Sequence, residues 1–193
     1  MLTDLACRVT SRIEWGCPDG AESPTWPAAL HRPAHLMVHH TAIRLAGEAS
    51  ADAVRAIWRL HAIDRGWGDV GYHYLVAPDG GIFEGRAGGP GVVGGHFIGG
   101  NHGTIGVALL GNFMVEPVSE AAVSALIELT AALGAAFGID PGRDAHPGPG
   151  GRLLPSLCGH RDGNPSTECP GDHLYARLAD VRRAAAAMIR ERR

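Results

Sequence analysis

Residues 66–86 read GWGDVGYHYLVAPDGGIFEGR and carry the clearest fold signal in the chain. Two short runs rich in apolar and aromatic residues, 72–77 and 81–84, stand on either side of the Pro78-Asp79-Gly80 turn. Such runs separated by a Pro-Asp-Gly turn predict a β-hairpin. The sheet of this protein is therefore expected to contain at least one antiparallel pair of strands.

Outside the hairpin, strand-like and helical runs alternate along the chain. The strand-like runs are residues 35–41, 104–110 and 157–160, and the helical runs are residues 50–64, 119–137 and 173–190. Ser50 is placed to cap the first helix and Gly66 to stop it, while Gly138 stops the second. This alternation predicts an α/β fold, bordering on α+β, with a central mixed β-sheet flanked by helices.

Length and composition favour a single domain. The 193 residues suit one domain, and 45% hydrophobic with 19% charged residues allow a real core. Residues 1–34 contain prolines, glycines and the short motif SRIEWG. We expect an irregular arm over residues 1–34 and the folded domain over residues 35–193.

Charge and hydropathy bear on the class of partner. The formal net charge is -3 and the sequence pI is about 6.4, so there is no basic excess for binding nucleic acid. We find no apolar run that predicts a transmembrane segment. The first stretch, MLTDLACRVTSRIEWG, lacks a positive region followed by an apolar one, so we expect no secretory signal peptide.

Four residues far apart in sequence are candidate metal ligands. His39 and His40 end the first strand-like run, and His160 and Cys169 flank a later loop. A catalytic zinc site uses three protein ligands and keeps one position open for water. Adjacent strand residues point to opposite faces, so only one of His39 and His40 can face such a site. Cys158 stands two residues before His160, on the same side of an extended strand, and is the alternative sulfur ligand.

One protein family contains the motifs of this chain in the same order. The motifs are SRIEWG (11–16), VHHTA (38–42), GWGDVGYHYLVAPDGGIFEGR (66–86), GGHFIGGNHGTIGVALLGNF (94–113) and GHRDGNPSTECPGDHLY (159–175). Together they resemble the type 2 N-acetylmuramoyl-L-alanine amidases, relatives of the peptidoglycan recognition proteins and of phage lysozyme-type amidases. Five motifs in order are far more specific than any one of them. The resemblance implies a fold like that of the peptidoglycan recognition proteins.

The resemblance also implies one Zn²⁺ per chain and assigns roles to residues. The implied zinc ligands are His39, His160 and Cys169. Tyr72 is the implied catalytic tyrosine, and Thr167, two residues before the ligand cysteine, is implied to assist catalysis. The residues implied to line the substrate groove are His40, Thr41, Trp67, His96 and Asn101.

One spacing departs from the family pattern. Cys169 follows His160 by nine residues, one more than is usual in the family. A loop insertion near residues 164–166 would accommodate the difference. The departure affects the placement of Thr167 more than that of the ligands.

The function implied by the resemblance is zinc-dependent hydrolysis of the amide bond between N-acetylmuramic acid and L-alanine in bacterial peptidoglycan. The expected partner is peptidoglycan, through its glycan strand and its stem peptide, and we expect the chain to act as a monomer. The alternative is a non-catalytic peptidoglycan-binding protein with a structural zinc. Non-catalytic members of the family lack the ligand cysteine, which this chain keeps as Cys169. A structural zinc would need a fourth protein ligand, for which Cys158 is the obvious choice.

The same function predicts where the protein acts, which is the bacterial cell wall. Without a signal peptide, two origins fit a bacteriolytic enzyme of this kind. One is a phage endolysin released from the cytoplasm, and the other is a secreted or periplasmic enzyme in trimmed form.

Two further pairs of residues have structural interpretations. Cys7 and Cys17 are ten residues apart and could form a disulfide or remain two free thiols. Glu84 and Arg86 are expected to form a structural ion pair.

Overall fold

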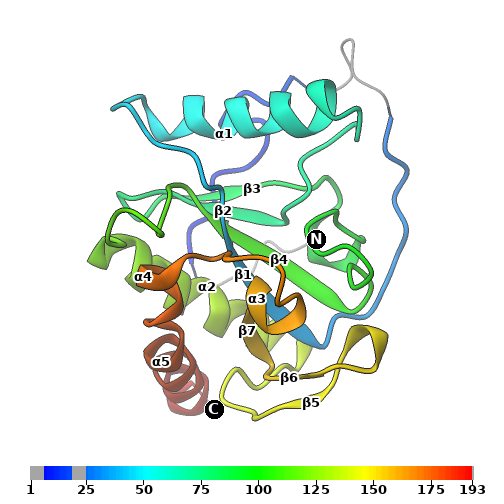
Figure 1. Cartoon of the computed structure of the whole chain (residues 1–193), viewed down its shortest axis with the longest axis vertical. Helices are drawn as coiled ribbons and strands as arrows, with labels where there is room; N and C mark the ends of the chain where they lie inside the picture. The colour runs from blue at the N-terminus through cyan, green and yellow to red at the C-terminus, as the bar shows by residue number, and fades with distance from the viewer. Residues whose placement is uncertain (1–6, 19–24, 193) are drawn as a thin grey trace.

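A five-stranded mixed sheet forms the centre of the molecule (Figure 1). The computed structural model describes residues 7–18 and 25–192. Within them the sheet contains β1 (His35–His40), β2 (Tyr74–Val76), β3 (Ile82–Glu84), β4 (Thr104–Leu109) and β7 (Leu157–Gly159). The strand order is β3-β2-β4-β1-β7, with β2 and β3 antiparallel and the other pairs parallel. The predicted hairpin and the predicted mixed sheet are therefore confirmed.

Helices cover both faces of this sheet, and a small hairpin lies beside it. The helices are α1 (Ser50–Trp58), the π-helical turn η1 (Arg59–Asp64), the 3-10 turns η2 (Gly89–Gly91) and η3 (Pro149–Gly151), α2 (Glu120–Phe137), α3 (His160–Gly163), α4 (Asp172–Tyr175) and α5 (Leu178–Glu191). The hairpin pairs β5 (His146–Pro147) with β6 (Leu153–Leu154). In Figure 1, α1 lies above the β2–β3 edge, whereas α2 and α5 lie on the opposite side of the sheet.

Side chains that alternate along the strands build a different core on each face. Leu36 and Val38 of β1 pack in the large cluster that includes the buried side chains of α2 and α5. Met37, between them, packs on the opposite face with Phe97 and Cys158. Burying an aliphatic side chain of this size contributes about 1.5–3 kcal/mol, so the alternation fixes the register of β1. His39 follows Met37 by two positions and therefore faces the side away from α2.

Helix α2 is capped at both ends, and the end at Gly138 is the one that the sequence predicts. The Ser119 hydroxyl accepts a hydrogen bond from the Ala122 N–H at 3.1 Å, and Gly138 ends the helix with a φ of 67°. By length and composition, α2 is the one helix in the described part of the chain that could cross a membrane. We expected no apolar run that predicts a transmembrane segment, and α2 is a single candidate by these two criteria alone. Burial of 56% of α2 against the sheet and α5 accounts for its composition.

Two helix predictions need correction. Ser50 is not the N-cap of α1, because Ala49 holds that position and the Ser50 hydroxyl donates to the Asp79 carboxylate at 3.1 Å. The predicted single C-terminal helix is divided into α4 and α5. The His173 N–H in α4 donates to the Phe113 carbonyl, which fixes the short helix separately from α5.

A buried ion cluster fastens the N-terminal arm to the domain. The Asp69 carboxylate lies 2.9 Å from Nη1 of Arg12 and 3.0 Å from Nη1 of Arg86. Arg86 also donates to the backbone carbonyls of Trp26 and Pro27 at 3.0 and 3.1 Å. The prediction that Arg86 pairs with Glu84 is wrong, because the Asp69 side chain occupies that partner position.

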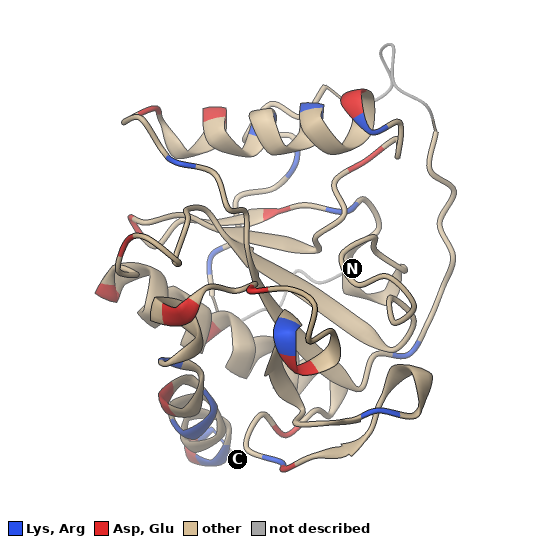
Figure 2. Ribbon diagram, viewed as in Figure 1, with Lys and Arg blue, Asp and Glu red and all other residues tan. Residues whose placement is uncertain are grey.

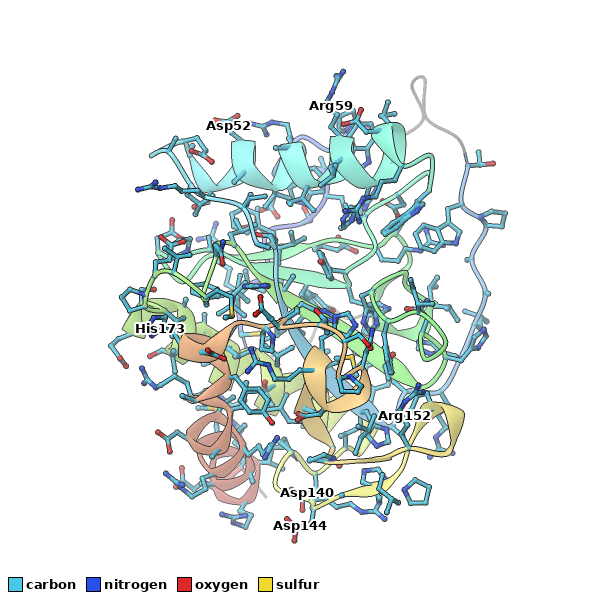
Figure 3. All side chains as sticks on the ribbon, viewed as in Figure 1. Asp52, Arg59, Asp140, Asp144, Arg152 and His173 are labelled. Atoms are coloured by element: carbon cyan, nitrogen blue, oxygen red, sulfur yellow. The ribbon has the colours of Figure 1, made fainter. Side chains whose placement is uncertain are left out.

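Charged residues avoid the central strands. Figure 2 shows them on α1, α5 and the surrounding loops, whereas β1 and β4 contain none. The labelled side chains of Asp52, Arg59, Asp140 and Asp144 in Figure 3 lie at the periphery in the same way. No disulfide joins Cys7 to Cys17 in the described part of the chain, and the two side chains pack against different clusters.

Candidate metal centre and groove

Three predicted ligands converge where β1 and β7 end. One ligand atom from each of His39, His160 and Cys169 lies within 4.8 Å of the others. We call these three residues the metal group, and it is the one group of this kind among the described residues. The Cys169 sulfur is 3.6 Å from Nδ1 of His39, and the imidazole centroids of His39 and His160 are 4.7 Å apart. His39 is near the end of β1, His160 begins α3, and Cys169 lies in the loop before α4.

The chemistry of these three donors fits zinc. Two imidazole nitrogens and one sulfur make a three-ligand set that leaves a coordination position open, as in catalytic zinc sites. Burial lowers the pKa of His39 well below its usual value and also lowers that of His160, so both rings are neutral at pH 7. Burial raises the pKa of the Cys169 thiol to about 11, so the thiol keeps its proton at pH 7 and would lose it when a metal cation binds the sulfur.

The loop that carries Cys169 is held by the residue after His160. The Arg161 N–H donates to the Cys169 carbonyl at 2.9 Å, and the Arg161 guanidinium bonds the Glu168 carbonyl and the Asp172 carboxylate. The Cys169 N–H donates to the Thr167 hydroxyl at 3.2 Å. These contacts hold the backbone at Cys169 in place, and none of them involves the sulfur atom.

Cys158 is not part of this group. Its side chain is fully buried with Met37, Phe97 and Leu154, and its sulfur lies 3.7 Å from the Leu36 carbonyl oxygen. We expected Cys158 and His160 to share one face of a strand. That expectation is wrong because β7 ends at Gly159 and His160 already belongs to α3.

His39 and His40 divide their roles as the strand geometry predicts. Nδ1 of His39 faces the Cys169 sulfur, whereas Nδ1 of His40 accepts a hydrogen bond from the Phe113 N–H at 3.3 Å. This bond ties the end of β1 to the loop after β4. The His40 side chain still reaches the edge of the groove described below.

Tyr72 lies against the metal group. Its ring centroid is 5.2 Å from that of His39 and 5.3 Å from that of His61. Burial, together with the nearby Cys169, raises the pKa of the Tyr72 hydroxyl well above its usual value. The hydroxyl therefore keeps its proton and can act as a hydrogen-bond donor.

A groove of about 760 Å³ opens over these residues. Besides the ligands and Tyr72, all the other residues predicted for the site line it: His40, Thr41, Trp67, His96, Asn101 and Thr167. Asn101 also shapes the wall of the groove. The Asn101 side-chain oxygen accepts the N–H groups of His96 and Phe97 at 2.9 and 2.7 Å, and so folds the loop that carries His96.

Seven further residues, to which the motifs assigned no role, also line the groove: Trp26, Ala42, His61, Arg65, Gly95, Ile98 and Asn164. Their contacts explain the placement of His61 and Arg65. The His61 Nδ1 accepts the Gly71 N–H at 3.1 Å, and the centroid of its ring lies 4.7 Å from that of the Trp67 ring, with the two planes tilted by 38°. The Arg65 guanidinium lies 5.0 Å from the centroid of the Trp67 ring. His61 could have been found, because it falls on the apolar face of the predicted first helix.

Trp26 reaches the groove from the N-terminal arm. The Arg86 guanidinium lies 4.3 Å from the centroid of the indole and holds the Trp26 carbonyl. The indole lies close to Gly95, where a Cβ would be 2.5 Å from Cη2 of the ring. No local sequence signal predicts this contact, because it depends on Arg86, 60 residues further along the chain.

Known proteins share both the sequence and this architecture. A family model described as N-acetylmuramoyl-L-alanine amidase matches residues 29–172. Peptidoglycan-recognition protein SC2 of Drosophila melanogaster is 28% identical over 173 residues, which cover 89% of this chain and 84% of that protein.

Two solved structures show the same likeness. Peptidoglycan recognition protein-LE, in complex with tracheal cytotoxin (monomeric diaminopimelic acid-type peptidoglycan), has a TM-score of 0.71 and 27% identity, with 89% of this chain and 92% of that chain covered. The endolysin N-acetylmuramoyl-L-alanine amidase LysCS from Clostridium intestinale URNW has a TM-score of 0.59 and 29% identity, with 78% and 84% covered. The family model spans most of the chain, and this protein therefore belongs to the N-acetylmuramoyl-L-alanine amidase family.

Proposed function

We propose that this protein is a zinc-dependent amidase that hydrolyses the bond between N-acetylmuramic acid and L-alanine in bacterial peptidoglycan. The observation that carries the proposal is the meeting of His39, His160 and Cys169 within 4.8 Å, in an open groove beside Tyr72. Zinc at such a site supplies a Lewis acid and activates water at neutral pH. The chain's own residues supply the ligands, the hydrogen-bond donors and the groove.

Tyr72 and Thr167 are proposed to stabilise the negative charge that develops on the amide oxygen. The Tyr72 hydroxyl keeps its proton and lies next to the ligand His39. The Thr167 hydroxyl oxygen accepts the Cys169 N–H, which leaves the Thr167 hydrogen free to donate. Donors fixed in advance at a developing oxyanion are the largest single contribution to many hydrolytic reactions.

The groove suits a polymer that carries both sugars and a peptide. Trp26, Trp67 and Ile98 present apolar surface, which packs well on sugar rings and methyl groups. Arg65 is the only lysine, arginine, aspartate or glutamate among the lining residues, and a cation of this kind attracts the carboxylates of a stem peptide. We propose peptidoglycan as the partner, bound by a monomer at His40, Thr41, Trp67 and Asn101 among others.

The alternative function is binding of peptidoglycan without cleavage, around a structural zinc. A structural zinc is held by four protein ligands, and Cys158 was the expected fourth. The burial of Cys158 in a separate cluster and the presence of an adjoining groove favour a catalytic site instead.

The place of action follows from the substrate. We propose that the protein acts on the bacterial cell wall. A likeness to a protein named as an endolysin supports a phage enzyme released from the cytoplasm. A secreted or periplasmic bacterial enzyme is the other origin that fits the proposed activity.

Digestion of purified peptidoglycan tests the proposed reaction. Mass spectrometry of the soluble products should find free stem peptides that begin with alanine, with no new reducing sugar ends. A zinc chelator should stop their release, and added zinc should restore it. New reducing ends would assign a glycosidase, and binding to the wall without product would assign the alternative function.

A further inference from the structure

A chain of buried hydrogen bonds leads from His39 into the protein. Nε2 of His39 lies 3.0 Å from Nδ1 of His96, and Nε2 of His96 lies 3.4 Å from the Thr104 hydroxyl. The Thr104 hydroxyl in turn donates to the Gly100 carbonyl at 2.8 Å. The three side chains belong to residues that are 0–7% exposed, so water does not substitute for these partners.

The last member of this chain determines the direction of every bond before it. The single hydroxyl hydrogen of Thr104 has two backbone carbonyls within reach, Gly100 at 2.8 Å and Asn101 at 3.1 Å. Both lie closer than Nε2 of His96 at 3.4 Å, so this hydrogen points to a carbonyl, which can only accept. The Thr104 oxygen can then only accept from His96, which requires the hydrogen of His96 to be on Nε2. Nδ1 of His96 is consequently a bare acceptor, so Nε2 of His39 must carry the hydrogen and donate it.

We infer that His96 and Thr104 are positioning residues that hold His39 in the tautomer that binds metal through Nδ1. In this tautomer Nδ1 of His39 has a free lone pair, and Nδ1 is the atom that lies 3.6 Å from the Cys169 sulfur. Both ring nitrogens of His96 take part in the chain. The role of His96 is therefore orientation of a ligand, in place of the substrate contact implied by the resemblance. The inference rests on the metal site of the proposed function.

The surroundings of His96 are built to hold this arrangement. Gly106 of β4 faces the imidazole, and a Cβ there would lie 2.4 Å from Cγ of His96. The neighbouring ring of His73, 5.5 Å away, does not compete for His96. Nδ1 of His73 accepts the Gly106 N–H at 2.9 Å, and its Nε2 donates to the Val92 carbonyl at 2.7 Å. Removal of a hydrogen-bond partner of a metal-binding histidine typically lowers metal affinity 10–100-fold.

Nuclear magnetic resonance of the metal-free protein tests the inference directly. Two-bond ¹H–¹⁵N correlations of the imidazoles at pH 8 should find the hydrogen on Nε2 in both His39 and His96. A hydrogen on Nδ1 in either ring would overturn the inference. The measurement needs no zinc, so its result stays separate from success or failure of the proposed amidase function.

A matched pair of variants tests the effect on metal affinity. Thr104→Ser keeps the hydroxyl, whereas Thr104→Val keeps the shape and removes the acceptor for His96. Zinc affinity, measured by competition with a chelator in variants with wild-type circular dichroism, should fall about 10-fold or more in Thr104→Val. Thr104→Ser should bind zinc as wild type does. Equal affinity in the two variants, or equal loss in both, would contradict the inference.

Discussion

The Cys169 sulfur lies 3.6 Å from Nδ1 of His39, although the two residues are 130 positions apart. Parallel pairing of β1 with β7 first brings His39 next to His160. The register sets Val38 beside Gly159, so the next residues along each chain are His39 and His160. The loop after α3 then folds back, held by Arg161, and brings the sulfur to the two imidazoles.

Replacement of Tyr72 by phenylalanine should slow the reaction and leave the metal in place. The variant loses one hydrogen-bond donor to the developing oxyanion, which typically costs on the order of 100-fold or more in turnover. Zinc content and thermal stability should stay close to those of the wild type, because the hydroxyl is not a ligand. Steady-state kinetics on a soluble muropeptide would check this, and unchanged turnover would remove Tyr72 from the mechanism.

Replacement of Trp26 by alanine should weaken substrate binding more than it slows turnover. The indole is part of the groove wall but is not among the residues beside the metal group. We expect KM to rise several-fold, by analogy with a lost aromatic contact of about 1 kcal/mol, with kcat little changed. Trp26→Phe is the control and should keep most of the affinity. A fall in kcat at constant KM would show that the arm acts in some other way.

The Asp69 ion cluster should contribute far more to the free energy of unfolding than an exposed ion pair does. Asp69→Asn removes the carboxylate that the buried Arg86 guanidinium pairs with, a change that typically costs about 3–5 kcal/mol. Asp52→Asn breaks the exposed pair with Arg55 and should cost less than about 1 kcal/mol. Urea unfolding of the two variants measures the difference, and similar losses would refute the assigned importance of the cluster.

Metal-free protein should lose stability as the pH falls below about 6.5. Burial lowers the pKa of His61 and His73 to about 4, whereas the unfolded chain protonates its histidines near pH 6.5. Between these values the unfolded state binds more protons, so the stabilisation is complete above pH 6.5 and is lost toward pH 4. Two such groups predict a slope of up to about 3 kcal/mol per pH unit. Urea unfolding in the presence of a chelator measures it, and equal stability at pH 7 and pH 5 would contradict the assignment.

Local sequence signals predicted the parts of the fold that depend on near neighbours. The turn at Pro78-Asp79-Gly80 and the stop at Gly138 rest on backbone preferences of a few residues, and both are present in the structure. Ser50 was misjudged because a distant side chain, Asp79, takes its hydroxyl. A capping preference is weaker than a tertiary contact of this kind.

The candidate site divides in the same way. The motifs indicated the ligand set and Tyr72, and the structure brings these residues together in one groove. Trp26 was missed because its position depends on Arg86, and the partner of Arg86 was missed because Asp69 is 17 residues away. The hydrogen-bond direction through His96 needs three segments in contact, which no sequence pattern specifies.

Zinc affinity and cleavage in two cysteine variants test the central claim most directly. Cys169→Ser should lower zinc affinity markedly and abolish release of stem peptides from peptidoglycan, because the thiolate is the anionic member of the ligand set. Cys158→Ser should keep both properties and lose only some packing, since that side chain lies in a separate buried cluster. The opposite pattern would show that the ligand assignment is wrong. Loss of zinc in both variants would mean a site closed by four protein ligands, which contradicts a catalytic metal centre.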